Sequence, residues 1–343
     1  RSKSYVQSYL IFSTLLDYYT GIKMCDAKNQ ASKKFWFWLS ISINLGFLGV
    51  FKYYNFFLEN FVNTFTLFGG ELRYNSLYII LPVGISFYTF QTLSYTIDVY
   101  KRKLEPANNF LAFAAFVSFF PQLVAGPIER ASNLLPQFYK KRKIDYSHAT
   151  DGLRQILWGL FKKMVIADNA AQIANEIFNN SGDYSGAHLF LGAFFFAFQI
   201  YGDFSGYSDM AIGIGLILGF KFPENFNAPY SSTSITEFWK RWHITLSSWM
   251  KDYLYIPLGG NRVTKKRLYF NLFLVFIISG FWHGASWNFI IWGAFHGVFL
   301  VLERLFLLKF YEKTGKVVST IFTFLIVVVG WVYFRIENLT YAN

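Results

Sequence analysis

Long apolar runs separated by short polar or basic stretches dominate this chain of 343 residues. A helix that crosses a membrane needs about 20 mostly apolar residues. This length predicts spanning segments near 5–22, 36–58, 76–98, 109–127, 150–178, 186–220, 268–281, 284–308 and 317–335. Polar or helix-breaking residues interrupt several of them, and an interrupted helix at membrane depth must be buried in protein or line a cavity. The pattern therefore predicts an all-α, polytopic transmembrane bundle without internal repeats.

The segment 109–127 conflicts with the positions of the basic loops if it crosses the membrane once. The basic loops at 23–34 and 101–103 are separated by two apolar runs, so both fit the cytoplasmic side under the positive-inside rule. The basic cluster 140–143 follows only one further run, and a single crossing would place it outside. Prolines and a glycine at the end of 109–127 break a helix. We therefore expect 109–127 to be re-entrant, entering and leaving by one face.

The segment 235–254 has a different pattern. Apolar side chains recur at helical spacing and charged or polar side chains fill the other face, which is typical of a helix lying in the membrane interface. Ser234 and Glu237 form a capping-box pattern that predicts its start. The loop 257–262 predicts its end.

Composition supports a membrane protein. The chain is 54% hydrophobic, 22% aromatic and only 15% charged, whereas soluble proteins carry about 25% charged residues. The net charge of +12 lies in short clusters between apolar runs, which fits cytoplasmic loops and contacts with anionic membrane lipids rather than nucleic acid. The single cysteine, Cys25, excludes an internal disulfide and a multi-cysteine metal site. We expect one domain over 1–343 that lacks terminal segments, since no signal pattern opens it at Arg1.

Two histidines, His243 and His283, each follow a tryptophan in or beside an apolar run. A titratable imidazole at bilayer depth is costly unless it is paired or used, and histidine suits general-base catalysis near neutral pH. His283 lies near Gly280 and Gly284, which permit close approach of backbone or substrate. Its alternative role is a buried histidine satisfied by a carbonyl. For His243 the alternatives are a snorkelling interfacial histidine and a residue in a polar pocket of the bundle.

Other polar residues have weaker patterns. Candidate hydrogen-bond partners of His283 are Ser286, Asn288 and the indoles of Trp282 and Trp287. We expect His296 to hydrogen-bond between helices, and His148 and His188 to be structural or solvated. No phosphate loop, metal-ligand cluster or nucleophile elbow is present in the sequence. Direct attack by an acceptor hydroxyl, deprotonated by a histidine, is the chemistry that remains.

Asp203 and Asp209 lie within an apolar stretch, six residues apart, so they do not share a helical face. One of them could orient a histidine as the acid of a catalytic triad does. The equal alternative is that they cap broken helices or pair with Lys or Arg. The glycine pairs 202/206 and 215/219 predict close helix packing.

The motifs together resemble a known family. Residues 238–247 (FWKRWHITLS) and 252–262 (DYLYIPLGGNR) resemble the signature of the membrane-bound O-acyltransferases, with the alginate O-acetyltransferase membrane subunit as the most similar branch. Residues 281–287 (FWHGASW) and 291–297 (IWGAFHG) resemble the segment that holds the essential histidine of that family. Further matches are 81–87 (LPVGISF), 97–100 (IDVY), 125–130 (AGPIER), 207–211 (YSDMA) and 224–227 (ENFN).

The resemblance implies a multi-pass bundle in the bacterial cytoplasmic membrane, arranged around a central funnel or tunnel. It implies that His283 is the catalytic base and His243 the second family histidine. Acetyl-coenzyme A would be the acyl donor, used as a substrate and not as a bound cofactor. A polysaccharide would be the acceptor, and an extracytoplasmic partner protein would complete transfer.

The predicted function is therefore O-acetylation of an extracytoplasmic polysaccharide. Lys240, Arg241 and Arg262 are candidates to hold the phosphates of coenzyme A, although the positive-inside rule explains these charges equally well. One alternative is the same fold acylating peptidoglycan, a teichoic acid or a lipid. The other is a polysaccharide or lipid transporter whose histidines relay protons.

Overall fold

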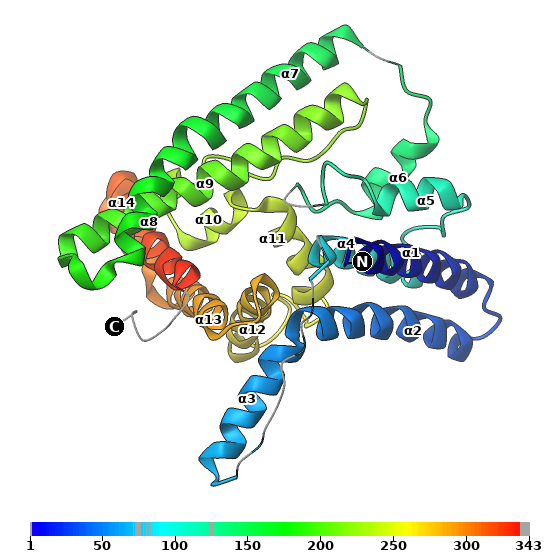
Figure 1. The fold of residues 1–343 in the computed structure, drawn as a ribbon, viewed down its shortest axis with the longest axis horizontal. Coiled ribbons are helices and arrows are strands. Elements are labelled where there is room, and N and C mark those ends of the chain that lie inside the picture. The colour runs from blue at the N-terminus through cyan, green and yellow to red at the C-terminus, as the bar shows by residue number, and fades with distance from the viewer. Residues whose placement is uncertain are drawn as a thin grey trace. The chain divides into compact units, whose positions relative to one another are not determined.

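The computed structural model describes residues 2–336 except 71, 73–76, 78, 80, 83, 124–125 and 144. All regular secondary structure in this described part is helical (Figure 1), which confirms the predicted all-α class. The chain divides into two compact units, residues 1–142 and 143–343.

The first unit is built around a polar cluster between three packed helices. Asp17 on α1 is fully buried; its carboxylate accepts hydrogen bonds from the Ser40 hydroxyl at 2.6 Å and the Asn44 amide at 2.9 Å, both on α2. The hydroxyl of Thr96 on α4 lies 2.9 Å from that of Ser40. The helices of this unit are α1 (Ser2–Asp26), α2 (Gln30–Leu48), α3 (Tyr54–Leu67), α4 (Ile85–Tyr100), α5 (Phe110–Val117) and α6 (Ala131–Tyr139).

The expected re-entrant segment contains one short helix. Of the stretch 109–127, only Phe110–Val117 is α-helical, and its eight residues extend about 12 Å at about 1.5 Å per residue. That is less than half of the roughly 30 Å hydrocarbon core. The helix α5 is thus too short to span, while its re-entrant orientation stays a prediction. Val124 and Ala125 lie outside the described residues.

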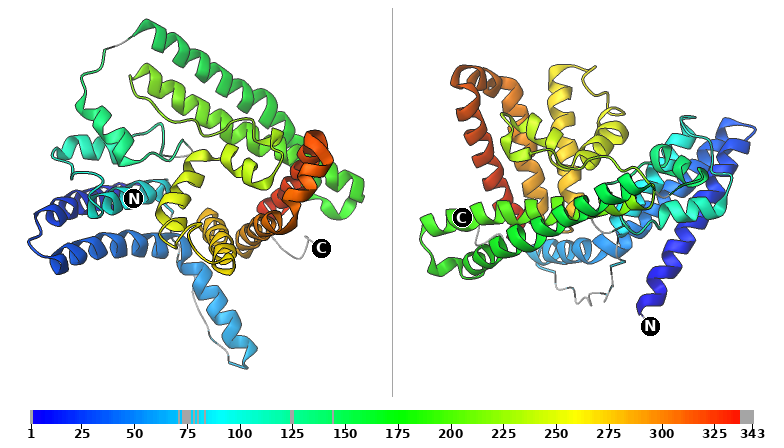
Figure 2. Two further views of the ribbon diagram at one scale, coloured as in Figure 1. Left: turned by 180° about the vertical axis from the view of Figure 1, so that it is seen from behind. Right: turned by 90° about the horizontal axis from the view of Figure 1, so that it is seen from above.

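The second unit contains the candidate site. The long helix α9 runs alongside α7 and α8, and α12 and α13 form a helical hairpin against which α14 packs (Figures 1 and 2). Its α-helices are α7 (Tyr146–Phe161), α8 (Asp168–Asn179), α9 (Gly186–Ile217), α10 (Ile235–Arg241), α11 (Ile244–Met250), α12 (Lys265–His283), α13 (Trp287–Leu302) and α14 (Leu308–Arg335). Buried aromatic rings from α10, α13 and α14 form the centre of its core, including Phe238, Trp292 and Trp331.

Three helical stretches of the described residues are long and apolar enough to cross a membrane: Gln30–Leu67, Gly186–Ile217 and Trp287–Arg335. They coincide with the predicted segments 36–58, 186–220 and, jointly, 284–308 and 317–335. The remaining predicted segments do not reach this length and hydropathy as continuous helices. The apolar runs therefore locate helices correctly within the described residues, and the number of spans stays a prediction.

The prediction of one continuous helix over 235–254 is wrong, because the segment forms two helices. α10 ends at Arg241 and α11 begins at Ile244, and between them His243 adopts a left-handed conformation with φ of +43°. The start is as predicted, because the Ser234 hydroxyl accepts a hydrogen bond from the backbone N–H of Glu237. The break arises from tertiary packing, since the Trp242 ring lies 4.7 Å from that of Trp331 on α14.

Glycines let α9 approach α7 and the segment after it. A Cβ on Gly206 would lie 2.7 Å from the carbonyl oxygen of Gly159, and one on Gly202 would lie 3.0 Å from that of Lys162. The packing role predicted for 202/206 is confirmed. For the pair 215/219, the prediction of close packing holds only for Gly215, which faces the Phe222 ring. Gly219 follows the end of α9, with φ of +76°.

We expect Gly206→Ala to lower the free energy of unfolding by about 2 kcal/mol, because the new methyl group cannot avoid a backbone oxygen. Gly186→Ala is the matched control, since no atom lies within 4 Å of its Cβ position. Thermal unfolding in detergent, followed by tryptophan fluorescence, measures both variants. Equal midpoints for the two variants would contradict the close packing.

Candidate active site

His283 is the last residue of α12, and its ring lies between aromatic side chains of three helices. The ring centroid is 5.0 Å from that of Trp282, 5.0 Å from that of Trp292 and 5.4 Å from that of Phe334, each in an edge-on arrangement. The imidazole is half-buried. It is therefore held in place by rings while part of its surface stays accessible.

The glycines near His283 bring α13 close to α12. A Cβ on Gly280 would lie 2.2 Å from the carbonyl oxygen of Phe289, and one on Gly284 would lie 2.2 Å from the Phe289 ring. The sequence predicted that backbone or substrate would approach these glycines closely. The group that approaches both of them is Phe289 of α13. It fixes the end of α12, and with it the position of His283.

His243 lies between α10 and α11 and is only 2% exposed. Its Nδ1 lies 3.0 Å from Oδ1 of Asn225, and its ring meets that of Phe204 edge-on at 4.6 Å. A snorkelling side chain would reach solvent, so this alternative is excluded. The other alternative, that His243 lies in a polar pocket of the bundle, agrees with its burial and with its hydrogen-bond partner Asn225.

The hydrogen bonds of Asn225 set the tautomer of His243. The backbone N–H of Thr245, 3.3 Å away, and its hydroxyl, 2.8 Å away, both donate to Oδ1 of Asn225, whose Nδ2 donates to Ser208 at 3.1 Å. Since Oδ1 is an acceptor, Nδ1 of a neutral His243 must carry the proton, and Nε2 keeps its lone pair. The loop residue Asn225 thereby orients the second histidine.

The two histidines are coupled electrostatically. Burial holds the pKa of His243 well below its ordinary value, and positive charge on His283 lowers it further. His243 is therefore neutral at physiological pH. A neutral His243 therefore adds no positive charge to the second unit's core.

Asp203 and Asp209 form ion pairs on α9. Asp203 lies 2.7 Å from Nζ of Lys163. Asp209 pairs with Lys162 and accepts a hydrogen bond from Gln155 at 2.8 Å. This geometry favours the second of the two sequence interpretations, pairing with lysine, and the residue that orients a histidine is Asn225.

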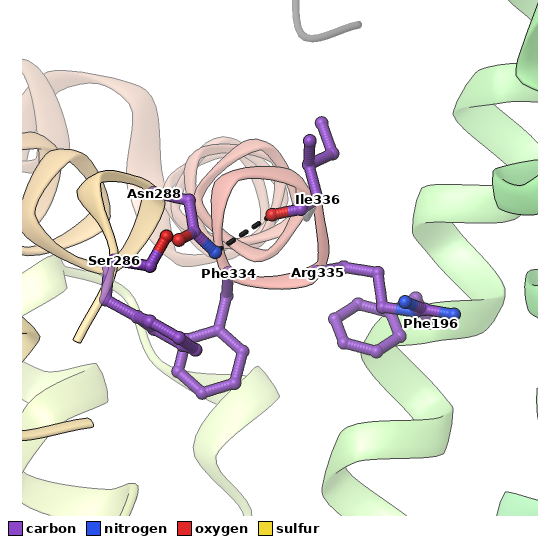
Figure 3. Close-up of a pocket in the computed structure, with 7 residues that line it drawn as sticks. Phe196, Ser286, Asn288, Phe334, Arg335 and Ile336 are labelled. Carbon is purple, nitrogen blue, oxygen red and sulfur yellow. Dashed lines mark hydrogen bonds between the residues drawn. The ribbon is translucent and has the colours of Figure 1, made fainter. Parts of the chain in front are cut away.

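A cavity of about 490 Å³ lies at the end of α14, between that helix and the start of α13 (Figure 3). Phe334 lines this cavity and also packs against the His283 ring. Asn288, expected as a partner of His283, lies in the cavity wall and donates to the carbonyl oxygen of Ile336 at 2.9 Å. The lining residues are Phe196, Ser286, Asn288, Phe289, Phe334, Arg335 and Ile336.

The three candidates for coenzyme A phosphates lie elsewhere. Lys240 and Arg262 are exposed, and Arg241 forms an ion pair with Glu237 at 2.8 Å. None of the three lines the cavity next to Phe334. Their role toward coenzyme A stays a prediction.

The remaining histidines divide as follows. His296 is fully buried between the rings of Trp239 and Trp292, at 5.0 and 5.2 Å. Neither of its ring nitrogens has a hydrogen-bond partner among the described residues, so the predicted interhelical hydrogen bond is wrong. His148 and His188 are exposed at the starts of α7 and α9, as predicted.

The chain is similar to known proteins of one family. The family model of the membrane-bound O-acyltransferases matches residues 103–339. The chain is 46% identical to a probable alginate O-acetylase of Azotobacter vinelandii over 96% of this chain and 66% of the relative. It is 42% identical to a peptidoglycan O-acetyltransferase of Helicobacter pylori over 97% of this chain and 68% of the relative. A teichoic acid D-alanyltransferase of Bacillus subtilis is 30% identical over 69% of this chain and 61% of the relative. The chain thus spans about two thirds of the length of these relatives, and it belongs to the membrane-bound O-acyltransferase family.

Proposed function

We propose that this chain is an O-acyltransferase of the bacterial cytoplasmic membrane that moves an acetyl group from acetyl-coenzyme A to hydroxyls of an extracytoplasmic polysaccharide, with a partner protein completing the transfer. The observation that carries the proposal is the half-buried imidazole of His283, which packs against three aromatic rings, one of which, Phe334, also lines a cavity. Family membership and the names of the O-acetyltransferase relatives support it.

His283 acts as the general base. Its imidazole takes the proton of a hydroxyl, either of the acceptor or of the partner protein that completes the transfer, while the oxygen attacks the thioester carbonyl. The tetrahedral intermediate collapses with cleavage of the carbon–sulfur bond, and the imidazolium returns the proton to the departing thiolate. The products are the O-acetyl ester and free coenzyme A.

His243 has a supporting role in this mechanism. Its 2% exposure leaves no room for a substrate hydroxyl at its ring. Because His243 stays neutral, it does not oppose the positive charge that forms on His283 in the transition state.

Mass spectrometry of envelope polysaccharides tests the proposed function. Deletion of the gene should remove acetyl groups from one polysaccharide fraction, and the wild-type gene should restore them. In membrane vesicles with isotope-labelled acetyl-coenzyme A, the label should appear in that polymer. Movement of polysaccharide without consumption of the thioester would instead indicate a transporter.

Peptidoglycan is the second candidate acceptor, because the peptidoglycan O-acetyltransferase matches 97% of this chain at 42% identity. The teichoic acid D-alanyltransferase matches less of the chain at lower identity, which favours acetyl as the transferred group. Peptidoglycan, teichoic acid and exopolysaccharide fractions should therefore be analysed separately for lost acetyl groups.

A further inference from the structure

Asp17 is a buried titratable residue that the proposed acyl transfer does not use. It lies on α1 in the first unit, and its side chain is 0% exposed. Helices α2 and α4 both pack against α1. An ionised carboxylate in a protein interior is costly unless a cation or several strong donors oppose its charge. The groups around Asp17 therefore decide whether it is folded as an acid or as an anion.

The groups that hydrogen-bond to the Asp17 carboxyl within the described residues are uncharged. The Ser40 hydroxyl lies 2.6 Å from Oδ1, and Nδ2 of Asn44 lies 2.9 Å from Oδ1 and 3.1 Å from Oδ2. The same Nδ2 donates to the backbone oxygen of Ser40 at 3.0 Å. Since an amide nitrogen carries two hydrogens, only one remains for both oxygens of Asp17. Two neutral donors do not balance a full negative charge in such an interior.

The side chains behind these donors continue the uncharged network. The hydroxyls of Ser13 and Thr92 donate to Oδ1 of Asn44 at 3.1 and 3.5 Å. The hydroxyl of Thr96 lies 2.9 Å from that of Ser40. All members of the network are at most 1% exposed, so water does not solvate a charge on Asp17: Ser13, Ser40, Asn44, Thr92 and Thr96.

The titratable side chains that face Asp17 are phenols. Tyr9 lies on α1 and Tyr95 on α4, both within electrostatic range of Asp17. Phenols ionise near pH 10, so both are neutral at physiological pH. α2 presents the serine and the asparagine of the network, and α5 consists of apolar residues. The nearest lysine along α1, Lys23, lies over the ring of Tyr19 at 5.3 Å.

We infer that Asp17 binds a proton in the folded protein and that its neutral carboxyl group joins α1, α2 and α4. The proton lies on Oδ1, which donates to the Ser40 hydroxyl, and this hydroxyl donates in turn to that of Thr96. Either hydroxyl can be the donor in their 2.9 Å contact, so the network permits this direction. Oδ2 then accepts from Asn44. The proton site is independent of the proposed acyl transfer.

The bound proton makes the first unit sensitive to alkaline pH. An aspartate of the unfolded chain releases its proton above about pH 3.9, whereas Asp17 in the network keeps it. The folded state then binds one proton more than the unfolded chain, so the folding equilibrium constant falls by up to about tenfold for each pH unit. Release of the proton leaves a charge between three helices, which favours their separation.

Infrared spectroscopy of the protein in detergent tests the protonation state directly. At about pH 6 an ordinary aspartate is ionised, and a protonated carboxyl group has a separate C=O stretching band. We expect this band in the wild type, and ¹³C at the aspartate carboxyl should shift it, which distinguishes Asp17 from the buried Glu129. Asp17→Asn should remove the band, and Asp26→Asn, at an exposed position on the same helix, should retain it. Absence of a labelled acid band from the wild type would overturn the inference, and this measurement needs no variant to fold.

The pH dependence of unfolding is the second measurement. Between about pH 5 and pH 9, the thermal midpoint of the wild type should fall relative to that of Asp17→Asn as the pH rises. His243 contributes equally to both proteins and cancels from the difference, and Asp26→Asn should follow the wild type. Parallel curves for the wild type and Asp17→Asn would contradict a bound proton. Stabilisation of the wild type by Na⁺ or K⁺ at constant ionic strength, lost in Asp17→Asn, would also refute it, because Asp17 would then be an anion that binds a cation.

Discussion

Replacement of His283 by alanine should lower the rate of acetyl transfer about a thousandfold, because general-base catalysis contributes about 10²–10⁴-fold. The acceptor hydroxyl is a weak nucleophile until its proton is removed, and the rings of Trp292 and Phe334 hold the imidazole where this can occur. The measurement is the initial rate of label transfer from acetyl-coenzyme A to the acceptor in membrane vesicles.

A loss of fold must be separated from a loss of chemistry. His283→Gln retains a side chain that fills the space between the rings, but this side chain cannot take up a proton at neutral pH. We expect its thermal midpoint to stay close to that of the wild type while its activity falls as far as that of the alanine variant. His148→Ala removes an exposed histidine at the start of α7 and should change neither quantity. Substantial activity in a folded His283→Gln variant would exclude His283 as the base.

The helical class could be predicted from the sequence, because it depends on local patterns, whereas the roles of both histidines stay predictions. The run before His283 has the apolar character of a helix, and α12 does end at this residue. The break at His243 could not be predicted, since Trp242 and Trp249 continue the apolar spacing of α10 into α11. Packing of Trp242 on α14 and the hydrogen bonds that Asn225 accepts from His243 and Thr245 override that local preference.

The positions of Asn225 and Arg335 could not be predicted from the sequence, for a different reason. Asn225 lies in the motif 224–227, which carried the family resemblance, but asparagine in a loop is most often a turn residue. Its role emerges only where the loop after α9 meets the break between α10 and α11. Arg335 follows an apolar run, where the sequence alone assigns it to a helix end. In the structure its guanidinium lies over the rings of Phe178 and Phe196, which are far away in sequence. Arg335 also lines a cavity, which the sequence could not show.

Removal of the Asn225 side-chain amide should lower both stability and activity. Asn225→Leu leaves the buried Nδ1–H of His243 and the donors of Thr245 without an acceptor, so we expect a loss of about 3 kcal/mol in unfolding free energy. Activity should also fall, but less than in His283→Ala, because Asn225 orients the supporting histidine and not the base. Asn225→Asp is the matched variant, because its carboxylate can still accept from His243 and from Thr245.

The pH dependence of stability distinguishes the two variants. The folded-state pKa of His243 lies well below its ordinary value of 6.5, so the unfolded chain takes up a proton first as the pH falls. Wild-type stability should therefore be fully present above about pH 6.5 and decline below it, by up to about 1.4 kcal/mol per pH unit from this residue. In Asn225→Asp the adjacent carboxylate favours the imidazolium ion and raises the pKa of folded His243. Its thermal midpoint, measured between about pH 5 and pH 8, should fall less steeply on acidification than that of the wild type. Identical slopes would show that His243 is not held neutral by this environment.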